Sequence, residues 1–152
     1  MAERPHLSPA VSYLDPMAAY RWLEEAFGFE PHMLIVDETG ALVHSQMKFG
    51  DSMVMIGGEW EEGRRTSPKK VGGANTQSVH VHMDGDIDTH CARARAAGAE
   101  IVAEPQDQFY GDRTYRARDP EGHIWTFGQT VKEMTPDEWD KGMPGIKTKM
   151  FT

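Results

Sequence analysis

The chain has 152 residues, a length that suits one ordinary domain with its own buried core. Its formal net charge of −8 produces a field that repels phosphate backbones. The basic residues form one short cluster, Arg64, Arg65, Lys69 and Lys70, among Gly, Ser and Pro. We therefore expect no nucleic-acid partner, and we interpret this cluster as a solvated linker rather than an anion site.

Cysteine content and hydropathy indicate where the protein works. Cys91 is the only cysteine, so an intramolecular disulfide is excluded, and without a companion cysteine it predicts a structural thiol. No apolar run approaches the roughly 20 residues needed to cross a bilayer, and the first residues lack the apolar stretch of a signal peptide. The sequence thus predicts a cytoplasmic protein with no membrane partner.

The first half of the chain predicts a strand, a helix and three more strands. A short apolar segment at 7–14, flanked by prolines, is typical of an edge strand. Asp15 and Pro16 indicate a helix start, because Asp caps free N–H groups and proline fits the first turn, and Gly28 indicates the end. Three strand candidates follow at 33–37, 42–49 and 53–57, separated by short turn-like segments.

The same order restarts after a polar stretch at 58–75, which predicts a linker because it carries no helix or strand period. Residues 77–83 alternate as a strand, and Asp86 opens a helix that Gly98 closes. The strand candidates that follow are 100–103, 114–118 and 123–128.

The spacing of four glycines supports an internal repeat. Gly28 and Gly98 are 70 residues apart, and Gly57 and Gly128 are 71 apart. We infer a single α+β domain built from two βαβββ modules, in which the two sheets form a curled mixed sheet around a central cleft with the helices outside. The expected boundaries are 6–57 and 76–129 for the modules, 58–75 for the linker and 130–152 for a helical tail.

The tail carries its own helix signal. Thr135 and Pro136, followed by two acidic residues, predict a helix start, and Trp139 and Met143 are four residues apart. Such an appendage must bury Trp139 either against its own domain or against a second subunit.

One segment resembles a known family. Tyr110 to Arg113, followed by the Asp119-Pro120-Glu121-Gly122 turn and then Trp125 and Phe127, is similar to the last hairpin of the vicinal oxygen chelate superfamily. This superfamily includes glyoxalase I, fosfomycin- and bleomycin-resistance proteins and extradiol dioxygenases. Together with the two helix endings, the resemblance covers about residues 6–130 and implies the paired βαβββ fold. The superfamily's habit of pairing modules across a dimer favours a homodimer.

The resemblance also permits a test for the superfamily's metal site. Its metal enzymes carry a His or Glu on the first and last strand of each module. The matching positions here are His6, Met55, Ser78 and Thr126, of which His6 alone is a plausible ligand. A divalent ion needs three or four well-placed N or O donors, so these substitutions argue against the usual metal.

Residues on the expected cleft side could hold a ligand instead. Successive strand residues alternate between faces, so His80 and His82 share one face while Val79 and Val81 share the other. The same alternation places polar residues and Met55 of the neighbouring strands on the cleft side, where methionine offers adaptable apolar surface and Arg116 favours an anionic ligand. Tyr110 and Arg113 are candidates because they lie in a glycine-containing loop that could fold over the cleft mouth. The candidate ligand-binding residues are His44, Gln46, Met55, Ser78, His80, His82, Tyr110, Arg113, Arg116 and Thr126.

Three functions remain compatible with these residues. The favoured one is a resistance-type protein that binds a small amphipathic or anionic molecule between the modules without a cofactor. The alternative is a glyoxalase-like lyase or isomerase, or a dioxygenase, whose divalent metal is held by some of His6, His44, His80 and His82. The third is an interaction module whose cleft holds a partner segment. Whether the protein is an enzyme stays open.

Overall fold

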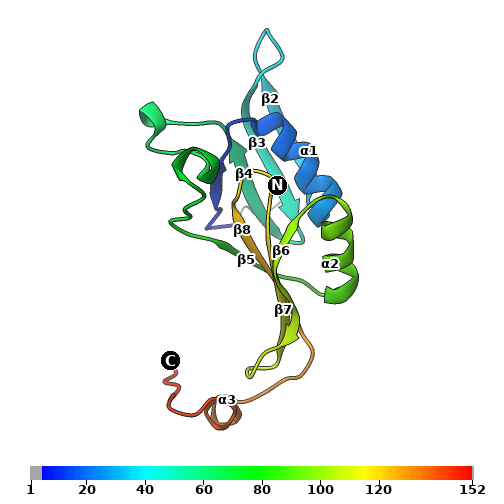
Figure 1. The fold of residues 1–152 in the computed structure, drawn as a ribbon, viewed down its shortest axis with the longest axis vertical. Coiled ribbons are helices and arrows are strands. Elements are labelled where there is room, and N and C mark those ends of the chain that lie inside the picture. The colour runs from blue at the N-terminus through cyan, green and yellow to red at the C-terminus, as the bar shows by residue number, and fades with distance from the viewer. Residues whose placement is uncertain (1–4, 152) are drawn as a thin grey trace.

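The structure, a computed structural model, describes residues 5–151. Each half of the chain contributes one strand, one helix and three further strands (Figure 1). The first half contains β1 (Ala10–Ser12), α1 (Pro16–Phe27), β2 (Glu30–Val36), β3 (Leu42–Phe49) and β4 (Ser52–Gly57). The second half contains β5 (Val79–His82), α2 (Ile87–Ala96), β6 (Glu100–Asp107), β7 (Asp112–Arg118) and β8 (Ile124–Thr130).

The two sheets have the same strand order, which confirms the two βαβββ modules and the α+β class. One sheet runs β1-β4-β3-β2 and the other β5-β8-β7-β6, and in each the first strand pairs parallel to the last while the other pairs are antiparallel. Within the described residues no strand of one sheet is hydrogen-bonded to the other sheet, so the modules do not close into one continuous barrel.

Helix α1 forms where its capping residues predict it. The Asp15 carboxylate accepts a hydrogen bond from the Ala18 N–H at 3.1 Å, and Gly28 ends the helix in the left-handed conformation, with φ +75°. Its apolar stripe is fully buried, with Leu23 and Phe27 both at 0% exposure. The helix therefore covers one face of its sheet and leaves the other face open.

The helices of the two modules also contact each other, and both lie on the same side of the molecule (Figure 1). The Trp22 indole donates to the Ala97 carbonyl at 2.7 Å, and the Arg93 guanidinium donates to two carbonyls in the last turn of α1. The Phe27 ring lies 4.7 Å from that of Phe127, centroid to centroid, so the core runs from one module into the next. This contact fixes the modules relative to each other.

The turn between β7 and β8 ties the second module to β1. The buried Asp119 carboxylate accepts hydrogen bonds from the Tyr13 hydroxyl at 2.6 Å and the Trp125 indole at 3.0 Å. Glu121 accepts from the two backbone N–H groups that follow Tyr13, and the His123 Nε2 contacts the Ser12 carbonyl at 2.6 Å. The turn predicted from the sequence thus also joins the modules.

The first strand and the sixth differ in length from the prediction. The strand expected at 7–14 is limited to Ala10–Ser12, which pairs with the last three residues of β4, from Met55, while Leu7 stays 88% exposed. Conversely β6 extends to Asp107, since β7 begins at Asp112 and continues to pair with it. Strand ends depend on the length of the partner, which local sequence does not report.

The segment predicted as an unstructured linker contains two short 3-10 helices, η1 (Glu61–Gly63) and η2 (Pro68–Val71). Ser67 caps the second by accepting a hydrogen bond from the Lys69 N–H, and its side chain is fully buried. The linker predicted at 58–75 thus contains two helical turns that the local sequence pattern does not indicate. The segment packs against the β7–β8 turn, which the local sequence does not reveal.

The tail contains α3 (Pro136–Gly142), which begins with a capping box between Thr135 and Glu138 as the sequence predicts. None of its residues is fully buried, and the helix lies at one end of the molecule, beside the loop before β7, where Gly142 faces Phe109 (Figure 1). Met150 and Phe151 further along are 67% and 91% exposed. No helix among the described residues is long and apolar enough to span a membrane.

Candidate functional site

Each sheet has one face without a covering helix, and corresponding residues of the two modules occupy equivalent register positions on these two faces. In the first sheet one row of paired residues runs Ala10, Met55, Gln46 and Met33 across β1, β4, β3 and β2. In the second sheet the matching row runs His80, Thr126, Arg116 and Ala103 across β5, β8, β7 and β6. Corresponding members are 70 or 71 residues apart in the chain, so the repeat extends to single positions of the site.

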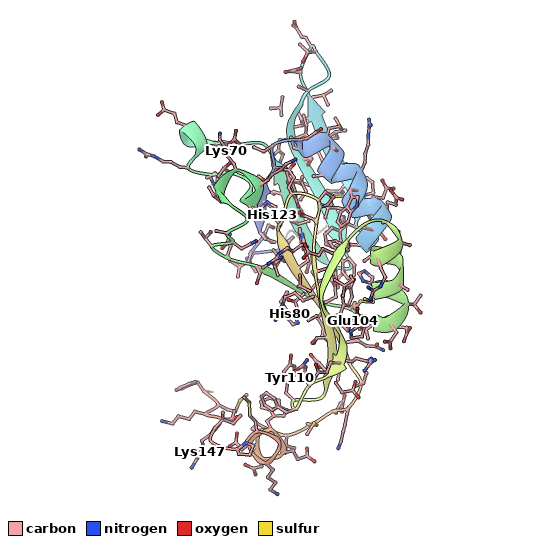
Figure 2. All side chains as sticks on the ribbon, in the orientation of Figure 1. Lys70, His80, Glu104, Tyr110, His123 and Lys147 are labelled. Atoms are coloured by element: carbon pink, nitrogen blue, oxygen red, sulfur yellow. The ribbon has the colours of Figure 1, made fainter. Side chains whose placement is uncertain are left out.

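The row in the second sheet is polar and cationic. The Arg116 guanidinium is exposed, and its Nε donates to the Thr126 hydroxyl at 3.3 Å. His80 stands on the next strand but one, exposed and directed away from α2 (Figure 2). Val79, Val81, Tyr115 and Ala117 point to the helix side, which confirms the predicted alternation of these strands.

A second pair of polar residues extends this face toward the end of β8. The His82 Nε2 lies 3.0 Å from the Thr130 hydroxyl, which in turn donates to the Asp112 carboxylate at 2.9 Å. Gly128 lies between Thr126 and Thr130 on β8, and a Cβ atom there would lie 3.2 Å from the His80 Nε2. The missing side chain at Gly128 therefore leaves room for the imidazole of His80.

The corresponding face of the first sheet carries methionine and uncharged polar side chains. The Gln46 amide nitrogen lies 3.2 Å from the His44 Nε2, and Met53 and Met55 stand half-buried on the neighbouring strand. Val54 and Ile56 point into the core, as the alternation predicts. Adaptable thioether side chains beside one amide and one imidazole can contact an irregular apolar group and hydrogen-bond its polar edge.

Tyr110 and Arg113 take different positions from each other. Tyr110 lies half-buried in the loop before β7, and burial raises the pKa of its phenol, with a smaller contribution from the Asp112 charge (Figure 2). Arg113 points to the helix side of the sheet, where it forms ion pairs with Asp88 at 2.9 Å and Asp107 at 3.0 Å. The structure therefore does not bring Arg113 together with Arg116 and His80.

The remaining candidates, Ser78 and His6, lie outside the two rows. Ser78 precedes β5 and borders a separate cavity between β1 and β5, and His6 is exposed four residues before Ala10. Within residues 5–151 no hydrogen bond joins the polar residues of one open face to those of the other. Seven of the ten candidates thus form two groups on two sheet faces, whereas Tyr110 lies in the loop before β7 and Ser78 and Arg113 lie apart from both groups.

The donor set does not fit the divalent metal that the superfamily's enzymes use. At the four matching positions Met55 offers a thioether, Ser78 and Thr126 offer hydroxyls, and only His6 offers an imidazole. Across the part of the chain that the structure describes, no three or more His, Cys, Asp or Glu side chains are placed to hold a metal ion. His6, His44, His80 and His82 are not gathered into such a group.

Two βαβββ modules with equivalent registers, each presenting an open sheet face, define a class of proteins. The chain belongs to that class: the model of the Glyoxalase/Bleomycin resistance protein/Dioxygenase superfamily matches residues 6–127. An uncharacterized protein of Mycobacterium tuberculosis is 30% identical over 142 residues, which cover 91% of this chain and 82% of that protein.

Solved structures show the same architecture. TioX from Micromonospora sp. ML1 is 34% identical, with a TM-score of 0.66 over 86% of this chain and all of that one. TnmS3, an antibiotic binding protein from Streptomyces sp. CB03234, has a TM-score of 0.63 at 20% identity, covering 86% of this chain and 98% of that one. At that identity the second likeness concerns the fold alone.

Sequence reasoning missed several positions of the two rows. Ala10, Met33, Ala103 and Gly128 were not among the candidates, although each pairs with or lies beside one that was. The 70-residue spacing, applied residue by residue, would have identified Ala10 as the equivalent of His80, whereas Met33 and Ala103 follow only from their pairing with Gln46 and Arg116. Alternation within single strands could not, because it contains no information on register between strands.

Proposed function

We propose that this protein binds a small amphipathic molecule with an acidic group on the open sheet faces, without the metal of its superfamily's enzymes. The observation that carries the proposal is the contrast between the two equivalent rows. Gln46 and Met55 offer soft, weakly polar surface, whereas Arg116 and His80 offer a cation and a hydrogen-bonding imidazole. An aromatic or polycyclic body suits the first row and an acidic group suits the second.

A homodimer is part of this proposal. Both faces are open in one chain, since the helices of both modules lie together on the other side. A ligand pocket normally encloses most of its ligand, and one open sheet face cannot do so. A second copy that lays its first sheet over the second sheet of this chain would bring the two rows to opposite walls of one cleft. Two equivalent clefts would result from the two-fold symmetry.

Arg116 provides the sharpest test of ligand binding. Isothermal titration with anilinonaphthalene sulfonate, and with natural-product antibiotics that do and do not carry an acidic group, would measure affinity. We expect Arg116→Gln to weaken binding of the acidic molecules roughly tenfold, because one charge-assisted hydrogen bond is lost. The matched control is Arg95→Gln, which removes an arginine of α2 that pairs with Glu104 of β6. Equal losses in both variants, or none in either, would contradict the proposal.

Metal analysis distinguishes binding from the alternative, a metal-dependent lyase, isomerase or dioxygenase. Protein purified without chelator and without a polyhistidine tag should contain far less than one Zn, Ni, Mn or Fe per chain. A stoichiometric metal would favour the enzyme and exclude the proposed function. A cytoplasmic location completes the proposal, since Cys91 is a buried free thiol whose pKa is raised by burial, as suits a reducing compartment.

A further inference from the structure

The segment between the modules is held in place at both ends. Near its start, Glu59 accepts hydrogen bonds from the Thr66 hydroxyl at 2.6 Å and from the Lys70 ammonium at 2.8 Å. Near its end, the Asn75 side chain donates to the Gly122 carbonyl at 2.9 Å and accepts from the Ile124 N–H at 3.1 Å. These contacts make residues 59–75 a fixed cover over the β7–β8 turn rather than a flexible connection.

A cavity of about 430 Å³ lies beneath this cover. It opens between the edge strands β1 and β5, and Val11, Val79 and Ile124 provide apolar surface in it. Hydrogen-bonding groups come from Ser12, Asn75 and Gln77, together with the imidazole of His123. The volume and this mixture of apolar and polar groups are typical of sites for small organic molecules.

The charges in this cavity are of one sign. Arg64 and Arg65 line it, whereas none of the described residues that line it is Asp or Glu. Both arginines also lack an ion pair with any side chain that the structure describes, unlike Lys70, which pairs with Glu59. In a chain with a net charge of −8, such a cavity attracts an anion that most of the surface repels.

The backbone around Arg65 limits where its guanidinium can lie. Trp60 and Arg65 form a backbone bridge with hydrogen bonds of 2.9 and 3.2 Å, and the guanidinium carbon lies 5.7 Å above the Trp60 ring. Stacking on an aromatic face leaves the guanidinium edge free to donate two hydrogen bonds to one oxyanion. The arginine is thus partly positioned before a ligand arrives.

From these observations we infer that the cavity under residues 59–75 is a second binding site, for a small organic anion that carries a carboxylate or a phosphate group. Arg64 and Arg65 bind the oxyanion, and the apolar surface of Val11, Val79 and Ile124 contacts the body of the molecule. The site lies between the edges of the two sheets, whereas Arg116 and His80 stand on an open sheet face, so the inference goes beyond the proposed function.

The test is a titration of the full-length protein followed by ¹H–¹⁵N NMR. The probes are benzoate and phenyl phosphate, with benzyl alcohol as the neutral analogue and inorganic phosphate as the anion without an apolar body. We expect both organic anions to shift the amide signals of Arg65, Asn75 and Gln77 saturably, and benzyl alcohol to leave them unchanged. Tighter binding of benzoate would assign a carboxylate ligand, and tighter binding of phenyl phosphate a phosphate ligand.

Three variants separate this site from general surface charge. Arg64→Gln combined with Arg65→Gln should weaken binding of the organic anions roughly tenfold or more. Lys69→Gln combined with Lys149→Gln removes the same charge outside the cavity and should change affinity less than twofold. Ala74→Trp keeps every charge but fills the cavity, and should also abolish binding.

Three results would overturn the inference: no saturable shift with either organic anion, equal losses in the two double variants, or shifts centred on His80 and Arg116. Arg116→Gln distinguishes the two proposals, because it should weaken binding at the open sheet face and leave benzoate binding under residues 59–75 unchanged. Either site can therefore fail while the other stands.

Discussion

At the scale of single residues, the structure assigns His90 a role that the sequence does not suggest. His90 belongs to α2, and its ring is buried among aromatic side chains. Its Nε2 lies 2.7 Å from the Phe27 carbonyl and its Nδ1 lies 2.6 Å from the Tyr115 hydroxyl. A carbonyl can only accept, so Nε2 carries the proton and Nδ1 accepts from Tyr115. His90 is therefore a neutral link between the end of α1 and the second sheet.

This arrangement predicts that acid destabilises the fold through His90. Burial lowers the pKa of the His90 imidazole in the folded chain, and the nearby Arg93 charge lowers it further. Below an ordinary histidine pKa of about 6.5 the unfolded chain takes up a proton that the folded chain refuses, so the stabilising contribution, complete above that value, is lost as the pH falls. Between pH 7.5 and 5.5 the loss is at most about 1.4 kcal/mol.

Urea unfolding at the two pH values measures this effect. His90→Gln keeps a polar side chain but does not titrate, so its free energy of unfolding should fall less with acid than that of the unaltered chain. Its stability at pH 7.5 should already be lower by about 1–3 kcal/mol, because a buried hydrogen-bonding group loses its partner. The exposed His32 provides the control, and His32→Gln should keep the full pH dependence. An unchanged dependence in His90→Gln would contradict the assignment.

At the scale of elements, the junction between the loop before β7 and the tail depends on one glycine. Gly111 adopts φ +100°, and its carbonyl accepts hydrogen bonds from the Val131 and Lys132 N–H groups at 2.9 and 3.0 Å. A Cβ atom at Gly111 would overlap the Lys132 carbonyl oxygen. The same glycine therefore holds the chain after β8 in place and positions the neighbouring Tyr110.

Gly111→Ala is expected to destabilise the protein by about 2–4 kcal/mol, because backbone strain and a steric overlap add. Gly40→Ala is a matched control, since Gly40 has a similar φ of +83° but would place its Cβ in open space. It should cost only the strain of a left-handed alanine, about 1 kcal/mol. Thermal unfolding of both variants gives the comparison, and similar losses would show that the contact with Lys132 has no weight.

The same scale shows which elements local sequence can predict. Both helices of the modules begin at the aspartates that the sequence indicates, because capping depends on residues within one turn. The length of β1 depends on β4, and the turns at residues 61–71 depend on Ser67 and Asn75 reaching the β7–β8 turn. These contacts join residues about 50 positions apart, so a pattern within a single segment carries no trace of them.

At the scale of the whole molecule, the sequence predicts the faces of the site but not their arrangement. The alternation in β3, β5 and β8 correctly separates core residues from those on the open faces, because it follows from strand geometry alone. The expectation that these faces meet as one cleft needs the relative placement of the two modules. That placement is set by the α1–α2 contact and by Asp119, which no repeat within the chain encodes.

Because both sheet faces are open in a single chain, we predict that the protein assembles as a dimer. A second copy would cover Arg116 and Met55 at once. The tail extends beyond the modules, and its exposed Met150 and Phe151 are available to a partner chain. Size-exclusion chromatography with light scattering should therefore give twice the mass of one chain. Met55→Glu places a carboxylate on the open face without altering the core, and we expect it to shift the equilibrium toward the monomer.

The control for this prediction is Ala92→Glu, which adds the same charge at an exposed residue of α2, on the helix side of the molecule. Its mass should stay that of the dimer, and circular dichroism should show that both variants remain folded. A chain truncated after Lys132 separates the contribution of the tail from that of the sheets, because it leaves every strand intact. If the unaltered protein is a monomer at concentrations where it binds its ligand, the cleft between two copies is excluded, and one chain must enclose the ligand by moving its modules.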